Sequence, residues 1–171
     1  MEIENNGRQL RSGVVAPIVA RAGGADNFEK LVSLMKTEDY TNGVWNAILS
    51  QEFPLPKYMV IPEFWVTNAH IRWRADLVVY RVADDRVILI YEGKKEGGGL
   101  LATMDALKQA MGAANLQGNA PSLMAALGDN VVLGNASGEN FCMSTDGIHG
   151  GSISDVIKDV GSQFDKVKRG M

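Results

Sequence analysis

The composition of the chain indicates one globular domain and excludes a generally basic nucleic-acid binder. Its 171 residues are 46% hydrophobic and 22% charged, with a formal net charge of -3, so any grip on phosphate must come from local patches. The single cysteine, Cys142, excludes an intramolecular disulfide and a zinc site built on several cysteines.

Nothing in the sequence predicts a membrane or secretory segment. No apolar run approaches the about 20 residues of a membrane span, and the first residues lack a basic region followed by an apolar one. We therefore expect an intracellular protein, with nucleus and cytoplasm left open. Glycine and proline interrupt the start of the chain, which predicts an N-terminal arm over 1–25 and a single domain over 26–171.

The first predicted elements are two helices and a strand. Asp26 and Glu29 resemble a capping box before a short amphipathic helix that runs to Met35. A second helix is predicted over 39–51, with an apolar face and a polar stripe that contains Asn42. Prolines follow it, and residues 58–67 are predicted to form a strand that carries Glu63.

The next segment has the pattern of a β-hairpin. Residues 77–82 and 87–91 are aliphatic, aromatic and β-branched, and the turn-forming pair Asp84-Asp85 lies between them. Alternation along the second strand places Glu92 and Lys94 on one face, while Asp76 precedes the first strand. The two acids are therefore expected at the open end of the hairpin.

Strand register decides whether these acids share a face. A two-residue loop at Asp84-Asp85 would pair Asp76 with Gly93 and put Glu92 on the opposite face. A three-residue loop over 83–85, or a bulge in either strand, would instead pair Asp76 with Glu92. We therefore predict an odd-length turn or a bulge.

The remainder of the chain is predicted to contain helices and short strands. Glycines at 97–99 precede a helix over 100–116, but they lack the lysine and hydroxyl residue of a phosphate-binding P-loop. Strands are predicted at 131–133 and 141–143, and a final helix with an apolar stripe at 152–168.

Asp76, Glu92 and Lys94 together predict metal-dependent phosphodiester chemistry. Mg²⁺ prefers oxygen ligands and retains several waters, so two carboxylates and a substrate phosphate can hold it. A lysine ammonium can contact the scissile phosphate or help to manage the proton of the attacking water. The alternative is a charged strand end in which Glu92 and Lys94 are only solvated.

Asp76 followed by Glu92-Gly93-Lys94 at the end of the next apolar strand resembles the PD-(D/E)XK nuclease superfamily. The resemblance covers residues 39–133, and Ala75 stands where members often have proline. It implies a restriction-endonuclease-like α/β fold, a mixed sheet flanked by helices in the order α-β-β-β-α-β. It also implies a nuclease that uses Mg²⁺ or Mn²⁺ and acts on nucleic acid, DNA rather than RNA on family grounds.

Further residues are candidates around this motif. Many members carry a glutamate on the first core helix, and some carry a glutamine on the helix after the lysine. The candidate accessory residues are Glu38, Asn42, Glu63 and Gln109. The candidate nucleic-acid-binding residues are Arg72, Arg74 and Lys95, for each of which ordinary surface charge is the alternative.

Two other functions remain open. A catalytically weak or inactive module of the same fold could bind nucleic acid or a protein partner, and the acidic net charge favours that alternative. A plain interaction domain, with incidental hairpin charges, is the third. Double-strand cutting would require two active sites and hence a homodimer.

Overall fold

The computed structural model describes residues 30, 33–67, 72–94, 99–113, 120–128, 130–135, 140–143, 164–165 and 167–169. The predicted arm over 1–25, the start of the first predicted helix and Lys95 lie outside these residues. The division into an arm and one domain therefore stays a prediction. No helix in the described ranges is long and apolar enough to cross a membrane.

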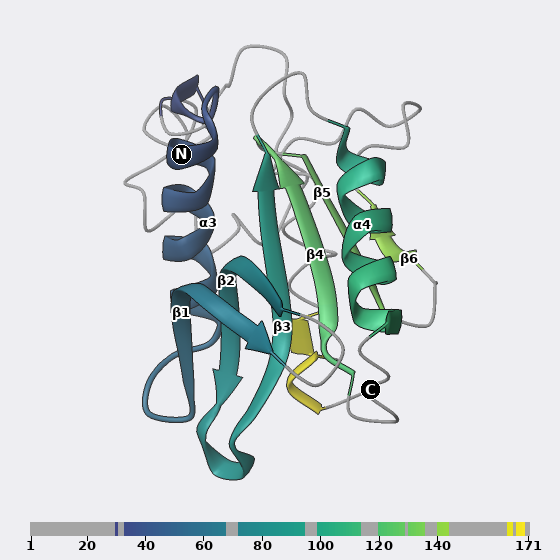
Figure 1. Cartoon of the computed structure of the whole chain (residues 1–171). Coiled ribbons are helices and arrows are strands. Elements are labelled where there is room, and N and C mark those ends of the chain that lie inside the picture. Colours follow the sequence, from purple (N-terminus) through teal and green to yellow (C-terminus); the bar gives the residue numbers. More distant parts are fainter. Residues whose placement is uncertain are drawn as a thin grey trace.

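The described chain forms a mixed sheet with a helix on each side (Figure 1). Its elements are, in order, α3 (Glu38–Glu52), β1 (Tyr58–Thr67), β2 (Arg72–Arg81), the 3-10 turn η1 (Val82–Asp84), β3 (Arg86–Lys94), α4 (Leu100–Ala113), β4 (Ser122–Leu127), β5 (Asn130–Asn135) and β6 (Asn140–Met143).

The strand order in the sheet is the same as in the chain, β1-β2-β3-β4-β5-β6. All neighbouring strands are antiparallel except β3 and β4, which are parallel. A parallel pair needs a crossover connection, and α4 supplies it. The predicted α/β class and the order α-β-β-β-α-β are confirmed, with β5 and β6 following.

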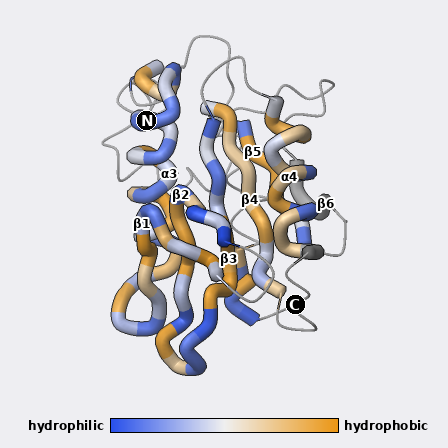
Figure 2. Tube along the Cα trace, viewed as in Figure 1, coloured by the Kyte–Doolittle hydropathy of each residue, from blue (hydrophilic) through white to orange (hydrophobic). Residues whose placement is uncertain are grey.

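Two apolar clusters lie on the two sides of the sheet. The first joins α3 to the sheet through Trp45, Leu49 and Tyr91, and Phe164 adds to it from near the C-terminus. The second joins α4 to the other side through Met104, Leu107 and Ile90. Figure 2 shows apolar residues concentrated along β4 and β5, which lie between these layers. Both faces of the sheet are thus packed against helices. This packing holds the C-terminal end of β3 in place.

Helix α3 begins directly after a capping residue, Thr37. The Thr37 side chain accepts a hydrogen bond from the backbone N–H of Tyr40 at 3.4 Å, and Glu38 and Asp39 stand in the first turn, where the helix dipole favours acidic groups. Trp45 Nε1 donates to the Gly128 carbonyl at 3.0 Å, which ties the helix to the turn after β4. The helix is therefore held beside the sheet.

The register of the β2–β3 hairpin confirms the predicted bulge. Arg81 pairs with Arg86 across a loop of residues 82–85, and Leu77 pairs with Tyr91 after a shift between Val79 and Tyr80. Ile88 is the extra residue in this shift. One step further along the same register places Asp76 opposite Glu92, so a bulge, and not an odd-length turn, brings the two acids to one face.

Strands β1 and β2 bend together (Figure 1). On one face of this hairpin, Leu77 and Val79 belong to the first cluster, whereas Ala75 belongs to the second cluster and Trp73 packs against it. Glu63 lies on β1 between the residues that pair with Ala75 and Leu77, and it has a positive φ of 49°. The outer part of the hairpin therefore curls across the sheet toward the α4 side.

Strand β4, the parallel partner of β3, is not predicted by the sequence pattern. Its residues Ser-Leu-Met-Ala-Ala-Leu contain no β-branched or aromatic side chain, and leucine, methionine and alanine favour helix in isolation. Residues 123–126 are fully buried in the central sheet. Burial between two clusters overrides the intrinsic preference at this position.

The final predicted helix falls mostly outside the described residues. Residues 164–165 and 167–169 are helical, and the predicted apolar positions Phe164 and Val167 are buried in the first cluster. Phe164 contacts Phe53 edge to face, with ring centroids 5.3 Å apart. This end of the chain therefore completes the layer that α3 begins.

Candidate active site

Asp76 on β2 and Glu92 on β3 lie together where the apolar part of the hairpin ends. Asp76 Oδ2 accepts a hydrogen bond from the backbone N–H of Gly93 at 2.8 Å, and the pKa of Glu92 is raised by burial and also by the charge of Asp76. Two carboxylates within electrostatic reach repel one another unless a cation lies between or beside them. The hairpin therefore creates a local concentration of negative charge.

Glu92 is buried, with only 8% of its surface exposed, and Lys94 is its ion-pair partner. Lys94 Nζ donates to Glu92 Oε1 at 3.0 Å. Burial is the main reason why the pKa of Glu92 is raised, Asp76 adds to it, and the ammonium of Lys94 only partly offsets both. The ion pair therefore does not fully compensate for the burial of this carboxylate.

The ammonium of Lys94 is held in its charged form. Burial alone would lower the pKa of Lys94, but the hydrogen bond and charge of Glu92, together with the charges of Glu38 and Asp76, outweigh burial. The net effect is a raised pKa. Lys94 is accordingly positioned as a fixed positive charge beside two carboxylates.

The second carboxylate oxygen of Glu92 has no hydrogen-bond partner. Across the described ranges, Glu92 Oε2 and Trp73 Nε1 are the buried side-chain atoms without a hydrogen-bond partner. The Trp73 indole lowers the pKa of Glu92 to a small extent, yet it completes no hydrogen bond with the carboxylate. A buried carboxylate oxygen without a hydrogen-bond partner destabilises the folded protein unless a bound ligand interacts with it.

Helix α3 supplies polar groups to the same place. Tyr91 Oη donates to Asn42 Oδ1 at 3.1 Å, and a Cβ added to Gly93 would overlap with the same Asn42 oxygen. Glu38, one turn earlier on α3, acts electrostatically on Lys94 and on Tyr91. The predicted residues Glu38 and Asn42 therefore do lie beside the hairpin motif.

Asp76 and Glu92 could supply oxygen ligands to a divalent cation. No group of three or more histidine, cysteine, aspartate or glutamate side chains suited to a metal occurs in the parts of the chain that the structure describes. One or two carboxylates are nevertheless enough for Mg²⁺, which retains water in its other positions. The open Glu92 Oε2 beside Asp76 fits a hard cation.

Other predicted residues lie further out. Glu63 is exposed and ion-paired with Arg74 at 3.8 Å. Arg72 and Arg74 are exposed on β2, before Asp76, and Gln109 is exposed on α4. The functional roles predicted for these residues stay predictions.

Sequence reasoning missed Trp73 and Tyr91 as parts of the site. Both are aromatic residues next to polar motif residues, Trp73 between two arginines and Tyr91 directly before Glu92. Strand alternation would place them away from the acids, and only the curled hairpin and the contact with α3 bring them close. Adjacency to the motif was the available signal.

Comparison with known proteins finds a similar fold among solved structures. No family model matches the chain, and no curated protein matches it. The fold is similar to part of a chain in the cryo-electron microscopy structure of the DrdV–DNA complex, with a TM-score of 0.55 and 15% sequence identity. The match covers 78% of this chain but only 13% of that chain. At this identity the likeness shows a common fold.

Proposed function

We propose that the protein is a divalent-metal-dependent nuclease of the PD-(D/E)XK type. The observation that carries this proposal is the buried Glu92, with one oxygen bound to Lys94 and the other without a partner, next to Asp76. A solvated strand end would expose these groups, and a purely structural ion pair would have little need for the second acid. A catalytic site needs all three.

Each residue has a distinct role in the proposed reaction. Mg²⁺ or Mn²⁺, when bound, lowers the pKa of a water and stabilises negative charge on the phosphate. Asp76 and Glu92 hold the cation, and the Gly93 N–H orients Asp76 through its Oδ2. Lys94 remains protonated and stabilises the negative charge that develops on the phosphate during attack.

DNA is the proposed substrate. The structure with a similar fold is that of a protein in complex with DNA, and Arg72 and Arg74 provide exposed positive charge next to Asp76 on β2. The net charge of -3 makes such a local patch necessary, because the whole surface would repel a polyanion. Cutting of both strands would require a homodimer.

A second candidate function is a binding module with the same fold and little or no cleavage. The observation in its favour is that the described ranges contain no group of three or more histidine, cysteine, aspartate or glutamate side chains suited to a metal. This candidate predicts DNA binding that does not depend on Asp76.

Incubation with nucleic acid distinguishes the two functions. Supercoiled plasmid, linear duplex, single-stranded DNA and RNA would each be treated with Mg²⁺ or Mn²⁺, with EDTA as the control. The nuclease proposal predicts metal-dependent products from DNA. Binding without products under all metal conditions would reject it in favour of the binding module.

A further inference from the structure

Trp65 lies exposed on the outer face of the bent β1–β2 hairpin. It pairs with Arg74 across the hairpin, and Thr67 pairs with Arg72. Nearly half of its surface, 48%, is exposed, whereas Phe64, Val66 and Trp73 on the other face pack against the second cluster. The core of the protein therefore does not require the indole of Trp65.

Two guanidinium groups lie over the ring of this indole in cation–π contacts. Arg72 Cζ lies 4.3 Å from the Trp65 ring centroid, and Arg74 Cζ lies 6.0 Å from it. Arg74 also faces Glu63 at 3.8 Å, but both side chains of this ion pair are more than half exposed, at 56% and 74%. Such an exposed pair is weak, so Arg74 is available to another anion.

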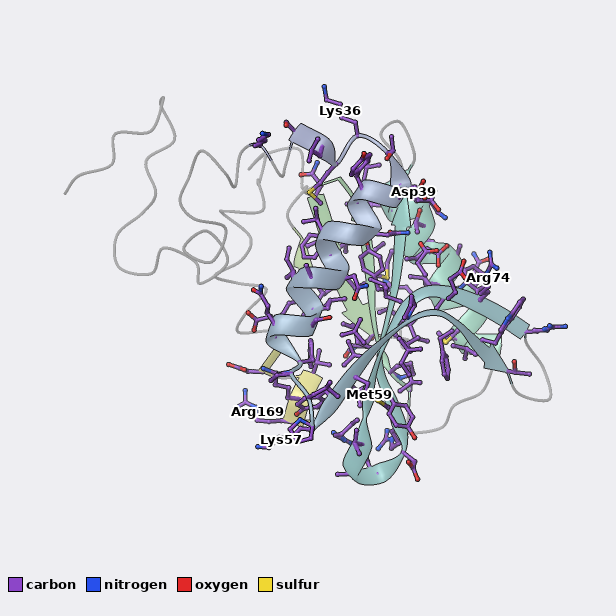
Figure 3. All side chains as sticks on the ribbon, turned by 90° about the vertical axis from the view of Figure 1, so that its left-hand side faces the viewer. Lys36, Asp39, Lys57, Met59, Arg74 and Arg169 are labelled. Carbon is purple, nitrogen blue, oxygen red and sulfur yellow. The ribbon has the colours of Figure 1, made fainter. Side chains whose placement is uncertain are left out.

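The patch of Trp65, Arg72 and Arg74 is close to the candidate active site. Arg74 precedes Asp76 by two residues on β2, which corresponds to about 7 Å along a strand. Figure 3 shows Arg74 on the bent hairpin, well separated from Arg169 at the other end of the molecule. A substrate strand that reaches Asp76 would therefore pass this patch.

We infer that Trp65 stacks on an unpaired base of the DNA strand while Arg72 and Arg74 contact the neighbouring phosphates. This inference rests on the proposed function and specifies its substrate as one with a single-stranded stretch. Every base has a π-face that suits an indole, and guanidinium groups bind phosphate in a bidentate manner. Paired and stacked bases in a duplex do not present that face.

The charges make an apolar protein partner a poor fit for the patch. Two guanidinium groups lie within 6.0 Å of the ring centroid, and an apolar surface placed on the ring would remove water from both of them without a compensating anion. A phosphodiester strand supplies the base and the anion together. The patch is therefore complementary to a nucleic-acid strand.

Fluorescence anisotropy in EDTA tests this inference without any cleavage. The probes are a labelled single-stranded DNA, a strand of equal length made of abasic sites, and the corresponding duplex. Trp65→Ala should weaken binding of the base-containing strand by about 5- to 150-fold, the range for loss of one stacked base. Its effect on the abasic strand should be small, and Trp65→Phe should retain most of the affinity.

Matched variants separate this effect from general damage. Val82→Ala shortens an apolar side chain of similar exposure, 43%, in the turn η1 that follows β2 and should leave binding unchanged. Arg74→Ala should weaken binding of base-containing and abasic strands alike, whereas Arg169→Ala should not. Melting temperatures establish that Trp65→Ala is folded.

Three results would overturn the inference: no binding of single-stranded DNA by the wild type, equal binding of base-containing and abasic strands, or equal affinity of Trp65→Ala and the wild type. The nuclease proposal fails by a different measurement, the absence of metal-dependent products. A protein that cuts DNA but does not use Trp65 refutes only the stacking, and one that stacks but does not cut refutes only the nuclease.

Discussion

Gly93, between Glu92 and Lys94, is the residue that allows α3 to approach the site. A Cβ at this position would overlap with Asn42 Oδ1 and would lie 2.8 Å from Tyr91 Oη. Gly93→Ala should therefore lower the free energy of unfolding by about 1–3 kcal/mol, the usual cost of an overpacked position. Urea denaturation measures this loss.

Two further variants make the Gly93 prediction specific. Gly43, in the middle of α3, has no atom within 4 Å of an added Cβ, so Gly43→Ala should stabilise the protein by about 0.5–1 kcal/mol. Asn42→Ala should reduce the cost of Gly93→Ala because it removes the overlapping oxygen. Equal costs of Gly93→Ala with and without Asn42 would contradict the described contact.

Glu92 gives the metal-free protein a pH dependence of stability. Its pKa is raised in the folded state, mainly by burial, so the folded state disfavours its ionised form relative to the unfolded chain. The protonated group carries no penalty below the unfolded pKa, and the penalty grows as the pH rises through the folded pKa. Glu92→Gln should therefore raise the melting temperature at pH 7.5 and change it little at pH 4.

The Glu92 prediction is checked by thermal melts of both proteins in EDTA over this pH range. Addition of Mn²⁺ at pH 7.5 should stabilise the wild type and not Glu92→Gln. A melting temperature of Glu92→Gln that stays at or below that of the wild type at pH 7.5 would show that Lys94 fully compensates the buried charge.

The predicted helices and strands differ in how far the positions of their ends depend on tertiary contacts. The helix predicted over 39–51 is observed as Glu38–Glu52, and the strand predicted over 58–67 is observed with those bounds. Capping residues and prolines determine these ends locally. The hairpin strands extend beyond their apolar runs, to Arg72 and Lys94, because pairing across the sheet continues after the apolar pattern has ended.

The local sequence of β4 does not predict a strand. Only its position between β3 and β5, in parallel register with the motif strand, makes Ser122–Leu127 extended. The bulge at Val79 and Tyr80 was predictable as one of two alternatives, because the acids needed a common face. The choice between turn and bulge depends on packing that the sequence pattern does not contain.

The start of α3 is predicted to contribute to the stability of the site. Thr37→Ala removes the side-chain acceptor for the Tyr40 N–H and should cost about 0.5–2 kcal/mol in unfolding free energy, whereas Thr37→Ser should retain most of the stability. Ser50→Ala, an exposed change within the same helix, should alter stability by less than about 0.5 kcal/mol. Equal effects of the Thr37 and Ser50 changes in urea denaturation would argue against the cap.

For the whole molecule, the sequence motif predicts which groups meet but not what surrounds them. Asp76, Glu92 and Lys94 are close in sequence, so hairpin register alone brings them together. Asn42 and Trp73 reach the site through the docking of α3 and the curl of the β1–β2 hairpin. These contacts depend on how the layers of the fold pack, and no local pattern encodes them.

The most direct test of the central claim compares Asp76→Ala with Lys94→Ala in paired measurements of Mn²⁺ binding and DNA cleavage. Asp76→Ala should lose both, because a proposed metal ligand is gone. Lys94→Ala should still bind Mn²⁺ but should cut about 10²- to 10³-fold more slowly, the usual cost of deleting one transition-state contact. Asp105→Ala, an exposed acid on α4, should behave like the wild type. Cleavage by purified Asp76→Ala at the wild-type rate would contradict the proposed active site.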